Sequence, residues 1–473
     1  MNNFIIASSM CSWCEAGDIT CDKSSVTEIH PFPVSISPNV NGRSYPIWSS
    51  PSQPPLQDGD SGAKVAIIVH HGAGRNGFDY ASYMLGALAL LNQTDHSAVF
   101  GAQVFEIGDE YLDIDHHIWW DSDGLDDDGL DPLFGEYNWK WGGESTRNLP
   151  ETISTFKVLD EMIETLRDPA LYPILERILV AGHSAGGQIV QRYALFNLVD
   201  DDPTKIPIEY FVANPSSAVY LSPERPVLPP SSTKTCSSFC DNFTIPETIY
   251  EFAVPPQSSD LKCGGEGGSY NSYGYGLDHF SAVKYCSQSS TSSALAQYQK
   301  RRVTYMSGSS DVCDLNFQID NDCTPGCTPD DGGLDPSCEA EAAGWCRMSR
   351  LHAFKQHVDK VYEEGGHVHK LLEVPFVGHS GCGMFQSKEF SDILVGKGVD
   401  ETEEWWSEVL FCVFGLLLFV SSYYAFKKAC FGEGEDQREK SETLRYEAVA
   451  VNAGEKSYDF DKVEMVESCG EKC

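Results

Sequence analysis

Two patterns of apolar and polar positions alternate along the middle of the chain. Continuous apolar runs rich in β-branched residues are typical of strands buried on both faces of a parallel sheet. The segment 65–69 is such a run, and less regular apolar segments at 102–107, 177–181, 210–213, 303–306 and 371–377 predict further strands. Between them, apolar residues at helical spacing predict helices over 78–91, 151–167 and 187–197. The alternation predicts an α/β fold with a mostly parallel, doubly wound sheet.

The composition outside this pattern divides the chain further. Residues 1–60 are rich in Ser, Pro and Cys and are expected to form an arm, which the α/β domain follows over 61–395. Within that domain, 216–300 is loop-like and Cys-rich, which predicts a cap or insertion over the sheet. The remaining segments are an acidic linker at 396–408, an apolar segment at 409–426 and a polar acidic tail at 427–473.

The apolar segment at 409–426 predicts a single transmembrane helix. It has no charged residue over a length close to the minimum for a bilayer span, and tryptophans precede it. Lys427 and Lys428 follow it directly, so the tail is expected in the cytosol and the main domain in a lumenal or extracellular space. A buried core helix is the alternative, but the polar tail supplies no domain to bury it. A signal peptide is not evident, because Met1–Met10 lacks a basic region.

The charge balance excludes one class of partner. The chain has 33 Lys and Arg against 70 Asp and Glu, a net charge of -37, whereas phosphate backbones need cationic partners. We therefore expect no nucleic-acid partner. The stretch Glu106–Glu136 contains twelve acidic residues and no Lys or Arg, which favours a solvated acidic loop. A Ca²⁺ loop is the alternative, but the EF-hand spacing is absent. No metal and no cofactor are predicted.

Cysteine usage indicates an oxidising compartment. Thirteen of the 17 cysteines precede residue 383, in loop-like sequence, which is typical of disulfides. A zinc site is the alternative for one group, whose irregular spacing favours disulfides instead: Cys323, Cys327, Cys338 and Cys346. Asn92-Gln-Thr and Asn242-Phe-Thr are glycosylation sequons, which also agree with a lumenal or extracellular domain.

One segment has the pattern of a nucleophile elbow. An apolar strand leads directly into Gly182-His-Ser184-Ala-Gly186, and a helix follows. A catalytic serine on a sharp, strained turn between strand and helix requires such small neighbours. The alternative is an ordinary βα turn, in which packing alone places the glycines. The segment predicts an α/β-hydrolase fold with Ser184 as the nucleophile.

An acyl-transfer site also needs donors for the oxyanion. These are usually the amide after the nucleophile and an amide in the loop that follows an early strand. Ala185 supplies the first. The loop His71-Gly-Ala73-Gly74 lies at the right place for the second, with Ala73 preferred to Gly74. A phosphate-binding loop is the alternative, but the Lys-Ser/Thr pair of a P-loop is absent.

The α/β-hydrolase order places the acid and then the histidine after the serine. Asp311 follows the run at 303–306 and is the predicted acid, with Asp314 as its competitor. His379 lies in a late loop after an apolar strand and is the predicted general base. His352 and His357 are expected on a solvated helix face.

Several segments together resemble a set of largely uncharacterised eukaryotic α/β-hydrolases that are common in fungi. They are His71–Asn76, Val180–Gln188, Ala213–Ser217, Leu334–Ala340 and Val377–His379. The loop beginning at His71 is also similar, more distantly, to that of secreted esterases of the polyhydroxybutyrate-depolymerase and feruloyl-esterase type. That resemblance implies ester substrates.

The combined hypothesis is a membrane-anchored serine hydrolase. It would act on small-molecule or lipid carboxylic esters through Ser184, Asp311 and His379, with an acyl-enzyme intermediate. Two alternatives stay open: a catalytically silent hydrolase fold that serves surface binding or adhesion, and a serine peptidase. The segment at 216–300 would shape the acyl pocket, so the substrate does not follow from the sequence.

Overall fold

A computed structural model describes most of the unit Met1–Val399. The described residues are 28–33, 43–106, 109, 112–120, 138–145, 151–200, 202–227, 250–258, 261–311, 334–335, 337–344, 346–363, 366–375 and 377–396. A second unit, Asp400–Cys473, lies outside them, and with it the predicted transmembrane segment. Within the described ranges, the helices are too short or too polar to cross a bilayer.

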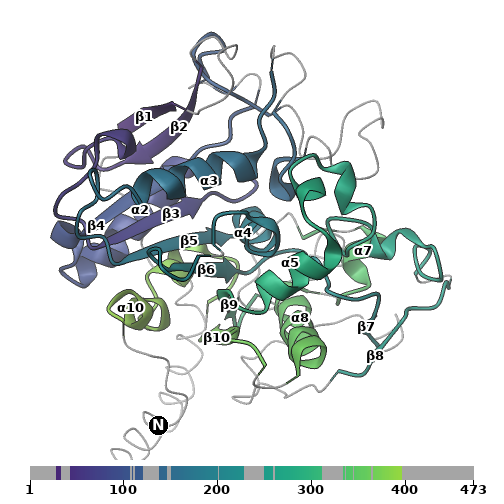
Figure 1. Ribbon diagram of the computed structural model, residues 1–473. Coiled ribbons are helices and arrows are strands. Elements are labelled where there is room, and N and C mark those ends of the chain that lie inside the picture. Colours follow the sequence, from purple (N-terminus) through teal and green to yellow (C-terminus); the bar gives the residue numbers. More distant parts are fainter. Residues whose placement is uncertain are drawn as a thin grey trace, which may run out of the picture. The chain divides into compact units, whose positions relative to one another are not determined.

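An eight-stranded sheet organises the described residues (Figure 1). Its strands are β1 Glu28–Pro33, β2 Ser44–Ser49, β3 Val65–His70, β4 Ser97–Ala102, β5 Arg177–His183, β6 Ile208–Ala213, β9 Arg302–Gly308 and β10 Lys370–Val374. Their spatial order is β1-β2-β4-β3-β5-β6-β9-β10, and β2 alone runs opposite to the other strands of this sheet. This order, with its one reversed strand, is that of the α/β-hydrolase fold.

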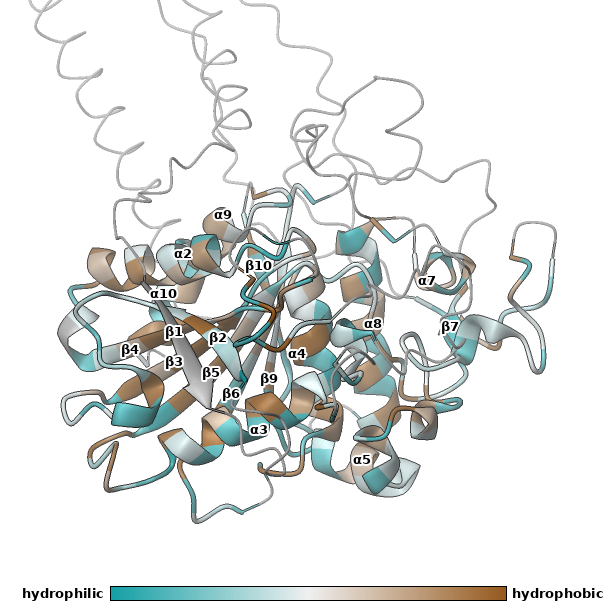
Figure 2. Cartoon of the chain, turned by 90° about the horizontal axis from the view of Figure 1, so that it is seen from above, coloured by the Kyte–Doolittle hydropathy of each residue, from teal (hydrophilic) through white to brown (hydrophobic). Residues whose placement is uncertain are grey.

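Helices cover both faces of the sheet, as the sequence predicted. Helices α2 Gly77–Leu90, α9 Gly381–Phe385 and α10 Lys388–Leu394 pack on one face, and α3 Thr155–Leu166, α4 Ala185–Phe196, α5 Thr291–Tyr298 and α8 Arg347–Tyr362 on the other. Because side chains alternate along a strand, Ile68 and Val180 join one core while Val69 and Leu179 join the other. Figure 2 shows the central strands as the hydrophobic layer between the two sets of helices.

The segment between β6 and β9 is an insertion that packs on the face of α3 and α4. Tyr273, Phe280 and Tyr285 from this insertion belong to the same core as α3 and α4. The Tyr285 hydroxyl donates to Asp160 of α3 at 2.7 Å. Its short elements are β7 Arg225–Pro226, β8 Phe252–Ala253, η6 Ser269–Asn271, η7 Phe280–Ala282, η8 Cys286–Gln288 and α5. The insertion is therefore part of the main core on this face.

Two stretches of the sheet differ from the sequence prediction. Strands β1 and β2 lie in the sheet, whereas the sequence predicted an arm there. The strand pattern was missed because it contains prolines. Pro31 and Pro46 face each other across the β1–β2 pair. Pro31 lies on the edge strand β1, where a missing amide donor is tolerated, and Pro46 lies just before the β2–β4 pairs, which begin at Ile47. Strand β4 ends at Ala102, where a strand was expected to begin. Gly101 resembles a breaker in sequence, yet it pairs in register with Val69.

The described cysteines form disulfides with one exception. Cys263 in the insertion is bonded to Cys338 at the start of α7, Cys338–Glu341. Cys346 is also disulfide-bonded, so the zinc alternative fails for two of its four proposed ligands. Cys286 is a free, buried thiol. Cys323 and Cys327 lie outside the described residues.

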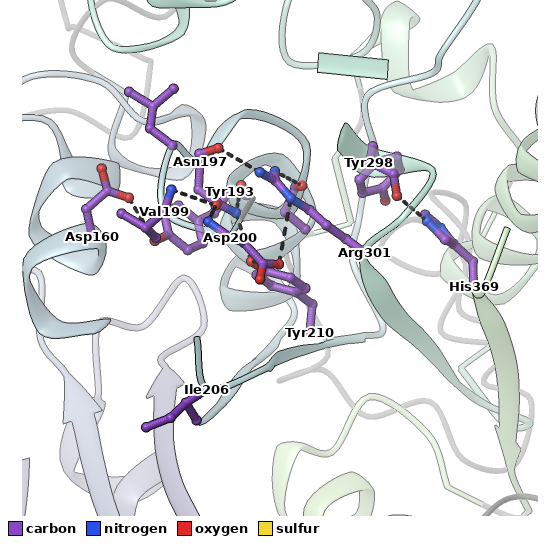
Figure 3. A network of polar contacts seen from close by, with 12 residues as sticks. Asp160, Tyr193, Asn197, Val199, Asp200, Ile206, Tyr210, Tyr298, Arg301 and His369 are labelled. Atoms are coloured by element: carbon purple, nitrogen blue, oxygen red, sulfur yellow. Dashed lines mark hydrogen bonds and ion pairs between the residues drawn. The ribbon is translucent and has the colours of Figure 1, made fainter. Parts of the chain in front are cut away.

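A buried polar network lies at the amino ends of the parallel strands (Figure 3). Arg301, directly before β9, donates to the carbonyl of Asn197 at 2.7 Å and pairs with Asp200 at 3.7 Å. The Tyr210 hydroxyl donates to Asp200 at 2.8 Å and accepts from the Asn197 amide at 2.9 Å. These contacts tie the end of α4 to β6 and β9.

Buried histidines should make the fold sensitive to acid. Burial lowers the pKa of His70 and His369 to about 4 and that of His357 to about 3, and it holds the pKa values of His71 and His183 well below the ordinary one. Below pH 6.5 these histidines become protonated in the unfolded chain but stay neutral in the folded protein. Each of them then lowers the free energy of unfolding by up to about 1.4 kcal/mol per pH unit.

We therefore expect the free energy of unfolding to fall by several kcal/mol between pH 6.5 and 4.5. Urea denaturation at a series of pH values measures this. Replacing buried His357 with Asn should reduce the slope of the unfolding free energy against pH by about one proton. An unfolding free energy that stays constant over this range would contradict the prediction. His357 had been expected on a solvated helix face; it lies on α8 but is fully buried.

Candidate active site

Ser184 occupies a strained turn between β5 and α4. Its φ is 58° and its ψ is -121°, a region that residues other than Gly rarely adopt and that costs about 1–3 kcal/mol. The turn requires small neighbours: a Cβ on Gly186 would lie 2.4 Å from the His70 carbonyl oxygen. This is the geometry of a nucleophile elbow, in which the serine side chain projects from the carboxyl edge of the sheet.

The structure brings His379 and Asp311 to this serine. His379 Nε2 lies 3.0 Å from Ser184 Oγ, and His379 Nδ1 lies 2.9 Å from Asp311 Oδ2. Asp311 follows β9 and His379 follows β10, so all three groups lie at the carboxyl ends of parallel strands; β9 and β10 are adjacent, and β6 separates them from β5. Asp314, the competing acid, lies outside the described residues.

Asp311 is fully buried and is also paired with Arg347, a cation that the sequence did not predict. Burial raises the pKa of Asp311, but His379 and Arg347 lower it more, so the net pKa lies below its ordinary value. Arg347 Nη1 lies 3.6 Å from Asp311 Oδ1, and both side chains are inaccessible to solvent. Asp311 therefore stays ionised. Arg347 begins α8, and no local motif links it to an acid 36 positions earlier.

His71 holds the candidate oxyanion loop. The Val104 amide donates to His71 Nε2 at 2.9 Å, so Nε2 is unprotonated and the proton resides on Nδ1. Nδ1 then donates to the Gly72 carbonyl at 2.8 Å, and the Arg75 amide donates to the same oxygen at 3.2 Å. Because a trans peptide is planar, the Ala73 N–H must point away from the Gly72 carbonyl. The loop is thus fixed before any ligand arrives.

This loop lies next to Ser184. A Cβ on Gly72 would be 3.6 Å from Ser184 Cβ. Ala185 begins α4, where a first-turn amide has no acceptor within its own helix. Among the described residues, the Ala73 and Ala185 amides donate to no backbone carbonyl outside the regular elements. Both amides are available to a bound oxyanion.

Tyr80 of α2 connects three parts of the site. Its hydroxyl hydrogen-bonds with His183 Nδ1 at 3.0 Å, and a Cβ on Gly72 would lie 2.7 Å from the same hydroxyl. The His183 ring packs on the His379 ring with centroids 4.5 Å apart. Burial, followed by the charges of His379 and Arg347, lowers the pKa of His183 well below its ordinary value, so His183 is neutral. His183 is the variable position of the elbow motif, and only the fold reveals its contacts.

Two substitutions of His71 should separate its two hydrogen bonds. His71→Asn keeps a donor at the Nδ1 position for the Gly72 carbonyl, whereas His71→Gln keeps only an acceptor at the Nε2 position for the Val104 amide. We expect His71→Gln to lower kcat about 10²-fold, because it releases the Ala73 amide, and His71→Asn to stay within about tenfold of wild type. Steady-state kinetics on an ester measures this. Equal losses in both variants would contradict the role of the Gly72 contact.

The two sequons differ in what the structure describes. Asn92 lies in the turn after α2 and is exposed, so its side chain is accessible to a glycosyltransferase. Asn242 and most of the acidic stretch lie outside the described residues.

No protein-family model and no curated protein matches the sequence, so the expected kinship with a fungal family stays a prediction. Among solved structures, the chain is similar to the poly(3-hydroxybutyrate) depolymerase LpqC from Bordetella parapertussis, with 16% identity, a TM-score of 0.45 and coverage of 81% of this chain and 94% of that chain. It is also similar to poly(aspartic acid) hydrolase-1 from Sphingomonas sp. KT-1, with 16% identity, a TM-score of 0.43 and coverage of 76% and 96%. Carboxyl esterase 2 from Tuber melanosporum is similar with 11% identity, a TM-score of 0.34 and coverage of 79% of this chain and 84% of that chain. Likenesses at this level do not bear on substrate.

Proposed function

We propose that this protein is a serine hydrolase that cleaves carboxylic esters through an acyl-enzyme intermediate. The observation that carries the proposal is the hydrogen-bonded chain from Ser184 Oγ through His379 to the buried carboxylate of Asp311, with distances of 3.0 and 2.9 Å. A serine is a weak nucleophile until an adjacent base takes its proton, and this chain supplies that base.

In the proposed reaction, Ser184 Oγ attacks the ester carbonyl while His379 Nε2 takes the serine proton. The Ala73 and Ala185 amides stabilise the oxyanion, and Asp311 stabilises the imidazolium. Collapse of the tetrahedral intermediate breaks the ester C–O bond, and His379 gives its proton to the leaving alcohol. Water then attacks the acyl group by the same steps, releasing the acid and restoring Ser184.

Labelling with a fluorophosphonate probe tests the nucleophile. The purified protein should be labelled and Ser184→Ala should not be. Ser82→Ala is the control, because Ser82 is a buried serine of α2 outside the candidate triad, and this variant should keep the label. A folded wild type that resists the probe would favour a silent binding protein. Hydrolysis rates for p-nitrophenyl esters and p-nitroanilides of the same acyl group separate an esterase from a peptidase.

We also propose that residues 409–426 anchor the enzyme in a membrane, with the hydrolase domain on the lumenal or extracellular side. The proposal rests on the uncharged length of this segment, on Lys427 and Lys428 after it, and on the exposed sequon at Asn92. The expressed full chain should resist extraction by alkaline carbonate and should lose a glycan in Asn92→Gln. Extraction of the intact chain by carbonate, or an unglycosylated Asn92, would count against it.

A further inference from the structure

The Asn-Pro-Ser-Ser segment that begins at Asn214 has no role in the proposed reaction, yet its first residue lies where the acid and base loops meet. Asn214 directly follows β6 and is almost fully buried, with 1% of its surface exposed. Its φ is 41°, in the left-handed region that Asn tolerates better than most residues. The Asn214 amide nitrogen of the main chain donates to the Met306 carbonyl of β9 at 3.0 Å.

The side chain of Asn214 joins the two loops with one planar amide. Its Oδ1 accepts from the Gly308 amide at 2.8 Å, and its Nδ2 donates to the Gly378 carbonyl at 3.1 Å. Gly308 ends β9 and accepts from the Asp311 amide at 3.0 Å, so it forms the base of the turn that presents the acid. Gly378 shares a peptide group with His379. One side chain therefore holds the backbone on both sides of the Asp311–His379 hydrogen bond.

The two loops are in direct backbone contact at this point. A Cβ on Gly308 would lie 2.4 Å from the Val377 carbonyl oxygen and 3.0 Å from that of Gly378. The Ser310 amide also donates to the Val377 carbonyl at 2.9 Å. A small shift of either loop would change the distance between Asp311 and His379, so whatever fixes this contact fixes the acid–base pair.

Few side chains could replace Asn214 here. The site needs one donor and one acceptor at the end of a short, rigid side chain. At neutral pH an aspartate has two acceptor oxygens and no donor, so one of its negatively charged oxygens would face the Gly378 carbonyl oxygen. Ala offers neither group and would leave the Gly308 amide and the Gly378 carbonyl without this partner.

The geometry points to Asn214 as a positioning residue that sets the alignment of Asp311 and His379. It touches neither substrate nor the reacting atoms and acts through the two backbones that it joins. The expected effect of Asn214 on turnover rests on the proposed serine-hydrolase function. Its expected effect on the Asp311–His379 contact does not require turnover.

Asn197 provides a matched control. It is also a fully buried asparagine whose amide bonds to the main chain, because its Nδ2 donates to the Tyr193 carbonyl at 2.9 Å. It lies in the network of Figure 3, at the far end of α4, about 20 Å along the helix from Ser184. Substitution of Asn197 should destabilise the fold without altering the candidate site.

The experiment compares Asn214→Ala, Asn214→Asp and Asn197→Ala in the full chain. Both Asn214 variants should lower kcat about 10²-fold with KM nearly unchanged and should slow fluorophosphonate labelling in parallel. Asn197→Ala should lose stability but keep kcat. If Asn214→Ala keeps kcat, or if Asn197→Ala loses as much kcat for the same loss of stability, the positioning role is wrong.

A second readout does not require activity. The low-field ¹H NMR signal of the proton between His379 Nδ1 and Asp311, assigned by its loss in Asp311→Asn, should be lost or broadened in Asn214→Ala and kept in Asn197→Ala. An unchanged signal in Asn214→Ala overturns the inference. If the wild type proves inert to esters and probe while the signal still responds to Asn214→Ala, the proposed function fails and the positioning role stands.

Discussion

Replacing Ser184 with Ala is expected to reduce ester hydrolysis by about 10⁶-fold while the protein stays folded. The substitution removes only Oγ, the atom 3.0 Å from His379 Nε2, and an alanine Cβ fits the space that the serine Cβ leaves. The strained backbone of the elbow, with φ of 58°, remains, so little change in stability follows. The residual rate would come from binding and from the oxyanion donors alone.

The measurement is kcat on a p-nitrophenyl ester, with the urea midpoint recorded for the same samples. Ser82→Ala, at a buried serine of α2 outside the candidate triad, controls for general effects of a serine-to-alanine substitution. A loss of less than about 10²-fold in Ser184→Ala, with an intact fold, would mean that another group carries the reaction.

Replacing Asp311 with Asn should lower kcat about 10⁴-fold. An asparagine amide can donate to His379 Nδ1, which would place the histidine proton on Nε2, where it can no longer accept the serine proton. The change also leaves Arg347 buried beside a neutral group. Removing one member of a buried ion pair costs about 3–5 kcal/mol, so the free energy of unfolding should fall as well.

Two further variants separate these effects. Arg347→Met on the Asp311→Asn background removes the unpaired cation and should recover stability without recovering kcat. Asp335→Asn is the matched control, because Asp335 accepts a hydrogen bond at 2.8 Å from the hydroxyl of Tyr275, a residue of the insertion. A large loss of kcat in Asp314→Asn with little loss in Asp311→Asn would show that the acid has been misassigned.

How much of this site was predictable depends on the range of each interaction. The elbow at Ser184 is formed by residues close together in the sequence: a strand, very small neighbours and the start of a helix. It can therefore be predicted from the sequence. The candidate acid and the candidate base were predicted from the order that the fold imposes on its loops. Position after a strand end was sufficient to favour Asp311 and His379, because parallel strands align their carboxyl ends at one edge.

The partners that tune the site could not be predicted in this way. Arg347, Tyr80 and Asn214 act through contacts between segments 36 to 164 residues apart, and no periodicity or motif connects such positions. Strands β1 and β2 were missed for a related reason. Local propensity counts prolines against a strand, whereas a neighbouring strand decides whether their missing amides matter.

By itself, therefore, the sequence determined the α/β architecture, the nucleophile elbow and the order of the loops that carry the other two groups. These are encoded in hydrophobic periodicity and in the steric demands of a sharp turn, both of which act over a few residues. Tertiary structure alone decided that the imidazole lies within 3.0 Å of Ser184, that Asp311 is buried against Arg347, and that Asn214 joins the two loops. Orientation, burial and charge pairing arise only when distant segments exclude water from one another.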